Sequence, residues 1–243
     1  MVMFLGLDGC SGGWLVCVGN DQVKFDFLET IEDCVNRYRD VESAFIDIPI
    51  GLPYPGVETR FCDSNSRKLL TRRRSSSIFP VPCRKAVYSD SYEAANKINK
   101  KVINKGLSKQ SWNISGKIKE ADMFLQENPD YKDILIESHP EVCFWALAGG
   151  KPMEFYKKTP KGERERIDIL RKFIGDFNGI LNSAREHLPA EKYVLDDLLD
   201  AAVLMVSARR SSHHYIEKFS ENCERDERGL LMRIVYPPLK SQS

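Results

Sequence analysis

Three short apolar runs in this sequence each end at an acidic residue that is followed within three residues by glycine or proline. The acids are Asp8, Asp47 and Glu137, which end the runs 3–7, 44–46 and 134–136. Short apolar runs bounded by chain-breaking residues are typical of buried strands. Open α/β proteins build their sites where parallel strands end at one edge of the sheet. The pattern therefore predicts an α/β protein with carboxylates gathered at that edge.

The first fifty residues predict three strands, a helix and a fourth strand. Glycine-rich turns separate the first three strands, which are expected at 3–8, 13–18 and 22–28. Such tight connections imply an antiparallel meander. A helix over 30–38 and a strand over 44–48 follow, and together with the preceding strand they imply a parallel, right-handed crossover.

Residues 52–132 differ in pattern from the rest of the chain, because prolines alternate with loop and helical segments. Helices are expected near 62–71, 90–104 and 114–127. We interpret this segment as a basic, mostly helical insertion before a fifth strand at 133–137. The remaining elements are expected to be helices over 140–148, 163–187 and 195–210 and a strand over 231–235.

The order of these elements resembles that of the ribonuclease H-like fold. This fold class is α/β, with a mixed five-stranded sheet in the order 3-2-1-4-5 that is flanked by helices. We expect residues 1–243 to form a single domain of this kind, with 52–132 inserted between strands 4 and 5. In that order the first and fourth strands are parallel neighbours, which would bring Asp8 and Asp47 side by side.

Charge is distributed unevenly along the chain, although the net charge is only +1. Residues 60–119 contain fifteen Lys or Arg and three Asp or Glu, a local balance of +12 that leaves −11 for the rest. A basic segment beside an acidic one suits a polyanion partner and a metal site. A solvated helical surface is the alternative explanation of the basic block.

Several classes of protein are disfavoured by composition. The seven cysteines are odd in number and irregularly spaced, which disfavours a zinc ribbon and is typical of reduced thiols in a cytoplasmic protein. No apolar stretch approaches the roughly 20 residues of a membrane helix. The N-terminus also lacks the basic flank of a signal peptide. We therefore expect a cytoplasmic protein with no membrane partner.

Closely packed carboxylates repel one another unless a cation is present, and Mg²⁺ or Mn²⁺ accepts such oxygen ligands. Asp200 shares a helix face with both Asp197 and Asp196, so either could accompany it. Two ions about 3.5–4 Å apart can stabilise both the attacking and the leaving oxygen when a phosphodiester bond is broken. The predicted metal ligands are Asp8, Asp47, Glu137, Asp197 and Asp200.

Other residues are candidates for contacting a phosphate or a water molecule. Glycines without a Cβ would let a phosphate backbone approach, and arginines could clamp phosphates, with a solvated loop as the alternative. His139 and Lys158 are the further catalytic candidates, although His139 could instead cap a helix. The substrate-binding candidates are Gly9, Gly12, Gly13, Arg72, Arg73, Arg74, Ser75, Arg84 and Lys157.

Motifs along nearly the whole chain resemble an uncharacterised family, domain of unknown function 429, whose members are described as predicted ribonuclease H-like nucleases. The motifs are GLDGC at 6–10, IDIPIGLP at 46–53, RRSS at 73–76, ESHPE at 137–141 and DLLDA at 197–201. The resemblance implies the fold and a metal-dependent nuclease activity. The chain departs from the family pattern at Ser11 and Glu163, where arginine is common. The layout of acids is also similar to that of Holliday-junction resolvases.

The sequence thus predicts a nuclease that uses Mg²⁺ or Mn²⁺ in a two-metal-ion mechanism. An ATP-dependent phosphotransferase of the sugar-kinase or actin-like type is one alternative, although such proteins usually need two domains of this fold. A non-catalytic nucleic-acid-binding protein is the other, and its affinity would be indifferent to magnesium. DNA and RNA are equal alternatives as partners, and the sequence leaves the oligomeric state open.

Overall fold

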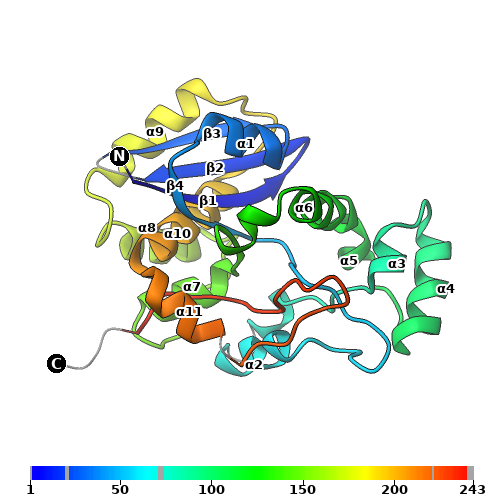
Figure 1. The fold of residues 1–243 in the computed structure, drawn as a ribbon. Coiled ribbons are helices and arrows are strands. Elements are labelled where there is room, and N and C mark those ends of the chain that lie inside the picture. The colour runs from blue at the N-terminus through cyan, green and yellow to red at the C-terminus, as the bar shows by residue number, and fades with distance from the viewer. Residues whose placement is uncertain (1, 20–21, 71–73, 221, 240–243) are drawn as a thin grey trace.

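The computed structural model describes residues 2–19, 22–70, 74–220 and 222–239. A mixed five-stranded sheet lies at its centre, and the order β3-β2-β1-β4-β5 confirms the predicted one (Figure 1). The strands are β1 (Met3–Cys10), β2 (Gly13–Gly19), β3 (Val23–Leu28), β4 (Val41–Ile46) and β5 (Leu135–Glu137). β1, β2 and β3 form the antiparallel meander, whereas β4 is parallel to both β1 and β5.

The crossover between β3 and β4 is helix α1 (Ile31–Arg37). Its first turn is fixed by a reciprocal capping box. The Thr30 hydroxyl accepts from the Asp33 N–H at 3.0 Å, and the Asp33 carboxylate accepts from the Thr30 N–H at 3.1 Å. The strand–helix–strand unit therefore forms as its local sequence predicts.

Helices cover both faces of the sheet, so the molecule has three layers (Figure 1). Alternate residues of β1 point to opposite faces. Leu5 and Leu7 pack with α1 and with α6 (Ser115–Glu127) on one face. The opposite face packs against α10 (Leu195–Arg210) and its neighbours α7 (Pro140–Leu147), α8 (Pro160–Leu170) and α9 (Phe177–His187).

Helix α10 approaches β1 unusually closely, and Gly6 is the reason. A Cβ at Gly6 would lie 2.1 Å from the Ala201 carbonyl oxygen and 2.3 Å from the Met205 nitrogen. No side chain fits between the two backbones. The helix is also apolar on nearly all sides, as expected for a helix buried between a sheet and other helices.

The segment between β4 and β5 is largely helical, as predicted. Arg84 ties it to the rest of the molecule, because its guanidinium donates to both oxygens of Asp122 at 2.9 Å and also pairs with Asp226. Besides α6, the segment contains α2 (Phe61–Leu69), η1 (Ser75–Ser77), α3 (Arg84–Val87), α4 (Tyr92–Ile103), α5 (Lys109–Asn113) and η2 (Pro129–Asp133).

Two predicted elements are wrong. The single helix expected over 163–187 is divided into α8 and α9, because the chain turns at 171–176 and the Asp176 carboxylate then caps α9 by accepting from the Gly179 N–H at 3.0 Å. The strand expected over 231–235 is absent from the described structure of this segment. Its ends form isolated bridges to different partners, Arg225 and Ser138, so no continuous ladder develops.

Helix α11 (His213–Ser220), which follows α10, was not expected from the sequence. None of the helices in the described parts of the chain combines the length and the apolar character that crossing a bilayer requires.

The Gly6 contact predicts a specific pattern of stability. Gly6→Ala should lower the free energy of unfolding by about 1–3 kcal/mol, because the added methyl group overlaps backbone atoms of α10. Urea denaturation followed by circular dichroism measures this. Gly116→Ala in α6 is the control, since no atom lies within 4 Å of its Cβ position, and it should be neutral or slightly stabilising. Equal stability of Gly6→Ala and wild type would contradict the close approach.

Candidate functional site

Asp8 and Asp47 meet at the carboxyl ends of the two central parallel strands. The register pairs Leu7 with Ile46, so the next residues, Asp8 and Asp47, lie side by side. The Asp47 N–H donates to the Leu7 carbonyl at 3.0 Å and holds this arrangement. Side chains two residues apart in a strand lie on the same face. Phe45 packs on the α10 face, so Asp47 lies on that face, and Asp8 lies there too because Gly6 faces α10.

Asp200 comes to the same place from the first half of α10. Helix α10 contacts Gly6 of β1 at Ala201, the residue that follows Asp200. Asp200 therefore lies near the strand end that carries Asp8. The Asp200 side chain is buried among apolar residues of α10. Three carboxylates from β1, the end of β4 and α10 thus share one corner of the molecule.

Lys157 supplies a positive charge to these acids. Its ammonium lies 2.7 Å from an oxygen of Asp200 and 3.8 Å from an oxygen of Asp196. Burial alone would lower the pKa of Lys157, but the carboxylates of Asp200, Asp8 and Asp196 together outweigh burial and the pKa is raised. The lysine therefore stays charged and bound to α10.

The acids affect one another's ionisation. Burial raises the pKa of Asp8 well above its ordinary value, the carboxylates of Asp200, Asp47 and Asp197 raise it further, and Lys157 lowers it. Burial likewise raises the pKa of Asp47, where His139 opposes the shift and Asp200 adds to it. A cluster that resists ionisation in this way has too little positive charge nearby, which is the condition that a divalent cation relieves.

The first turn of α10 contains the two aspartates between which the sequence did not decide. Asp196 is buried, and one of its oxygens has no hydrogen-bond partner among the described residues. Asp197 is half-buried and uses an oxygen to cap its own helix, by accepting from the Val194 N–H at 2.8 Å. Both remain near Asp200. Asp196 and Asp200 both pair with Lys157, whereas the charge of Asp197 raises the pKa of Asp8.

Glu137 is not brought to this cluster. It pairs with Ile46 in the sheet, and Leu135 two residues earlier packs on the α1 and α6 face, so Glu137 points to the side opposite Asp8. Both of its oxygens are engaged by Arg60, at 2.6 and 2.7 Å, and one also accepts from the Ile50 N–H at 2.7 Å. Glu137, predicted as a metal ligand, therefore faces Arg60 and not the other acids.

The loop that carries Lys157 is fastened by two buried arginines. Arg74 donates to the carbonyl oxygens of Met153 and Glu154, both at 3.1 Å. Arg166 is fully buried, pairs with Glu141, and donates to the Phe155 carbonyl at 3.4 Å. Arg74, predicted to clamp phosphate, thus holds protein backbone in this structure.

The other predicted contact residues lie in varied positions. Lys158 is exposed, and it is Lys157 that contacts the acids. His139 precedes α7, and its Nε2 lies 3.3 Å from the Ser77 carbonyl oxygen. Arg84 is committed to its ion pairs with Asp122 and Asp226. Ser75 lies in η1, while Arg72 and Arg73 fall outside the described residues.

The glycines after Asp8 differ in their structural roles. Gly13 is buried, and a Cβ there would lie 2.4 Å from the Leu28 carbonyl oxygen, so its lack of a side chain serves strand packing. Gly9 and Gly12 are exposed at the edge of the site. Gly12 has a φ of 78°, in the region that favours glycine.

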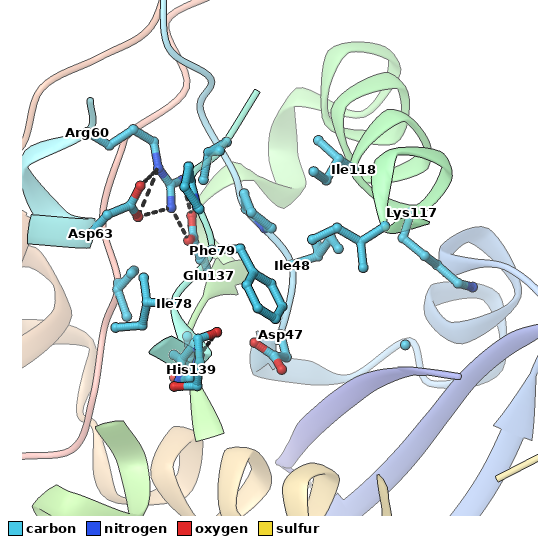
Figure 2. Close-up of a pocket in the computed structure, with 18 of the residues that line it drawn as sticks. Asp47, Ile48, Arg60, Asp63, Ile78, Phe79, Lys117, Ile118, Glu137 and His139 are labelled. Atoms are coloured by element: carbon cyan, nitrogen blue, oxygen red, sulfur yellow. Dashed lines mark hydrogen bonds and ion pairs between the residues drawn. The ribbon is translucent and has the colours of Figure 1, made fainter. Parts of the chain in front are cut away.

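A cleft of about 160 Å³ begins at Asp8 and Asp47 and extends toward the insertion (Figure 2). His139 lies beside Asp47 in it, and Arg60 closes its far side between Glu137 and Asp63. Lys117 lies at the rim, and its ammonium is 4.2 Å from the centre of the Trp14 ring.

The donor set suits a hard divalent cation in its chemistry. Carboxylate oxygens converge from three elements, and Asp196 keeps a buried oxygen without a hydrogen bond. Within the described parts of the chain, however, no group of three or more His, Cys, Asp or Glu side chains is arranged so that it could hold a metal ion. Lys157 occupies the Asp200 carboxylate instead, so a metal ion would have to displace it.

One protein family matches this chain over residues 6–225, and its description is "Protein of unknown function (DUF429)". The chain belongs to this family. The span that matches DUF429 contains every candidate acid from Asp8 to Asp200. No curated protein and no solved structure matches the chain.

Two features of this DUF429 site were missed in the sequence. Arg60 pairs with Glu137, and its local signal in the sequence is Asp63 three residues later, the spacing of a helical ion pair. Lys117 reaches the rim of the cleft from α6, where the sequence shows it as one of several lysines on a helix surface. Long-range contacts of this kind leave little trace in a local pattern.

The raised pKa of Asp8 predicts that Asp8→Asn stabilises the fold at neutral pH. Burial disfavours the charged form of Asp8 in the folded state, and the neighbouring carboxylates repel it, so removing the charge should raise Tm by about 2–4 °C for each kcal/mol relieved. Below the ordinary pKa of 3.8 the carboxyl is protonated in the folded and unfolded chains alike, and the variant should have no advantage. The advantage should grow as pH rises from that value to the raised pKa and stay constant above it.

Thermal unfolding at several pH values, without divalent metal, measures this difference. Asp90→Asn removes an exposed aspartate and is the control for the loss of one negative charge. A lower Tm for Asp8→Asn at neutral pH would show that the carboxylates do not repel one another as the geometry indicates.

Proposed function

We propose that this protein is a Mg²⁺- or Mn²⁺-dependent nuclease that hydrolyses phosphodiester bonds of a nucleic acid by a two-metal-ion mechanism. The observation that carries the proposal is the meeting of Asp8, Asp47 and Asp200 at one corner of the sheet. The acids are buried or half-buried and come from three different elements. Enzymes that bind catalytic metals need such convergent oxygen ligands, held by a rigid scaffold.

In this proposal Asp8, Asp47 and Asp200 hold the metal, with Asp196 or Asp197 completing the shell. Bound Mg²⁺ or Mn²⁺ would activate the attacking water and stabilise the leaving oxygen. Lys157 leaves Asp200 when metal binds and is then free to contact a phosphate oxygen. His139, beside Asp47 at the cleft, is placed to orient a water molecule.

The charge around the acids supports a polyanionic substrate. Lys117 lies near Gly9, and the Lys192 ammonium is 3.2 Å from the Cβ position of Gly12, so lysines border the exposed glycines. Lys157 contacts the acids directly, and the exposed Lys158 follows it in the chain. A rim of lysines around a carboxylate cluster attracts phosphates to a place where a metal can engage them.

Loss of a metal ligand should abolish both metal binding and hydrolysis. We expect Asp8→Asn and Asp200→Asn to reduce cleavage of labelled DNA or RNA by at least about 100-fold, more than the loss of a residue that only supports a ligand. Calorimetry should show that each variant has lost its Mn²⁺ binding. Asp168→Asn, in an exposed pair with Arg171, is the control and should match wild type. Cleavage that persists in a chelator would contradict the proposal.

Replacing Lys157 should separate metal binding from hydrolysis. Lys157→Met removes the ammonium that competes for Asp200, so Mn²⁺ should bind about fivefold more tightly, the equivalent of an ion pair of about 1 kcal/mol. Hydrolysis should nevertheless fall, because the phosphate contact is lost. Lys172→Met removes an exposed lysine and is the control. Weaker Mn²⁺ binding by Lys157→Met would show that the lysine does not compete with metal.

A further inference from the structure

The cleft beside the acids has an apolar wall that metal chemistry does not require. Phe79 is half-buried there, and Ile48, Ile78 and Ile118 line the same space. Figure 2 shows Phe79 next to Asp47, with His139 on one side and Lys117 on the other. A substrate group that reaches this cleft therefore meets carboxylates at one end and hydrocarbon beside them.

At the far end of the cleft, Arg60 is shared by two carboxylates, those of Glu137 and Asp63. Arg60 donates to both oxygens of Glu137, to Asp63, and to the carbonyl oxygens of Ile50 and Gly51. All of its donor nitrogens are thus engaged by protein groups, so Arg60 is not available to bind a phosphate. Such an end does not favour a phosphate, and it suits a neutral group instead.

The dimensions of the cleft fit a single planar ring. Its volume is about 160 Å³. An apolar cavity of roughly 150 Å³ is known to hold benzene, so a six-membered ring fits a space of this size. Phe79 supplies an aromatic face, and stacking of a base on an aromatic side chain contributes about 1–3 kcal/mol.

From these features we infer that the cleft binds one unpaired nucleobase next to the scissile phosphate, so that the substrate is single-stranded at the point of cleavage. The inference rests on the proposed nuclease function, because that function supplies the nucleic acid. Lys117 at the rim would contact the phosphate that follows the bound base. A base in an intact duplex is stacked and paired, and it would first have to leave the helix to enter the cleft.

Binding in the absence of cleavage tests this inference. The protein carries Asp8→Asn to prevent hydrolysis, and fluorescence anisotropy compares a 20-nucleotide single strand with the blunt duplex of the same sequence, about equal in length. We expect the single strand to bind at least about tenfold more tightly, which corresponds to one stacked base at about 1.4 kcal/mol. One abasic position would not lower the affinity of a single strand, because another base could occupy the cleft. A homopolymer is therefore compared with its fully abasic analogue. The abasic analogue should bind about tenfold more weakly.

Variants at Phe79 identify the cleft as the site. Phe79→Ala should weaken binding of the single strand by about tenfold and leave binding of the duplex unchanged. Phe79→Tyr keeps the ring and should match the parent protein. Thermal unfolding of both variants checks that they fold, and if Phe79→Ala does not fold, Phe79→Leu, which keeps the apolar bulk without the ring, takes its place.

The outcomes separate this inference from the proposed function. Equal affinity for single strand and duplex, or equal loss of both on removal of the Phe79 ring, would overturn the inference while leaving the nuclease proposal in place. Binding of neither nucleic acid by the Asp8→Asn protein would overturn the inference, and the cleavage assay with wild type then decides the nuclease proposal. Preference for the single strand that disappears with the ring would support the nucleobase site.

Discussion

The contact between α10 and β1 at Gly6 determines where the acids lie. With no side chain at this position, the backbones touch, and the Ala201 carbonyl lies where a Cβ would be. A helix held this closely cannot slide along the strand or rotate, because neighbouring atoms already fill the space. Asp200 is one residue from the contact and Asp8 is two residues from it. Their proximity therefore follows from backbone packing, and electrostatic repulsion between the carboxylates is not strong enough to separate them.

A second constraint comes from buried arginines, which connect distant segments to the site. Arg74 from the insertion and Arg166 from α8 both hold the loop before Lys157 by its carbonyl oxygens. Backbone oxygens and Glu141 accept from nitrogens of these buried guanidinium groups, which compensates in part for their burial. The insertion thus contributes to the placement of Lys157 as well as forming one wall of the cleft. A change in the insertion would be transmitted to the acids through this loop.

The sequence predicts the sheet well because its signals are local. Apolar runs, glycine-rich turns and the Thr30 cap each depend on a few adjacent residues, and the strand order follows from the sequence of elements. The break between α8 and α9 was missed, since helical charge patterning continues across Gly175. Asp8 and Asp47 were identified for the same local reason, as acids at predicted strand ends, and Asp200 was identified by its helical spacing from Asp196 and Asp197. Ion pairs such as Arg60 with Glu137, 77 residues apart in the chain, have no such signal.

Asp47 and Glu137 have similar local sequence patterns but different structural surroundings. Both follow an apolar run and both precede a proline, so the sequence assigns them the same role. The sheet distinguishes them by one position, because Glu137 pairs with Ile46 and Asp47 comes one residue later. Side chains alternate between faces, so a difference of one residue sends the two carboxylates to opposite sides. Glu137 then pairs with Arg60 at the far side of the cleft, while Asp47 stays among the acids, so the register gives two similar motifs different surroundings.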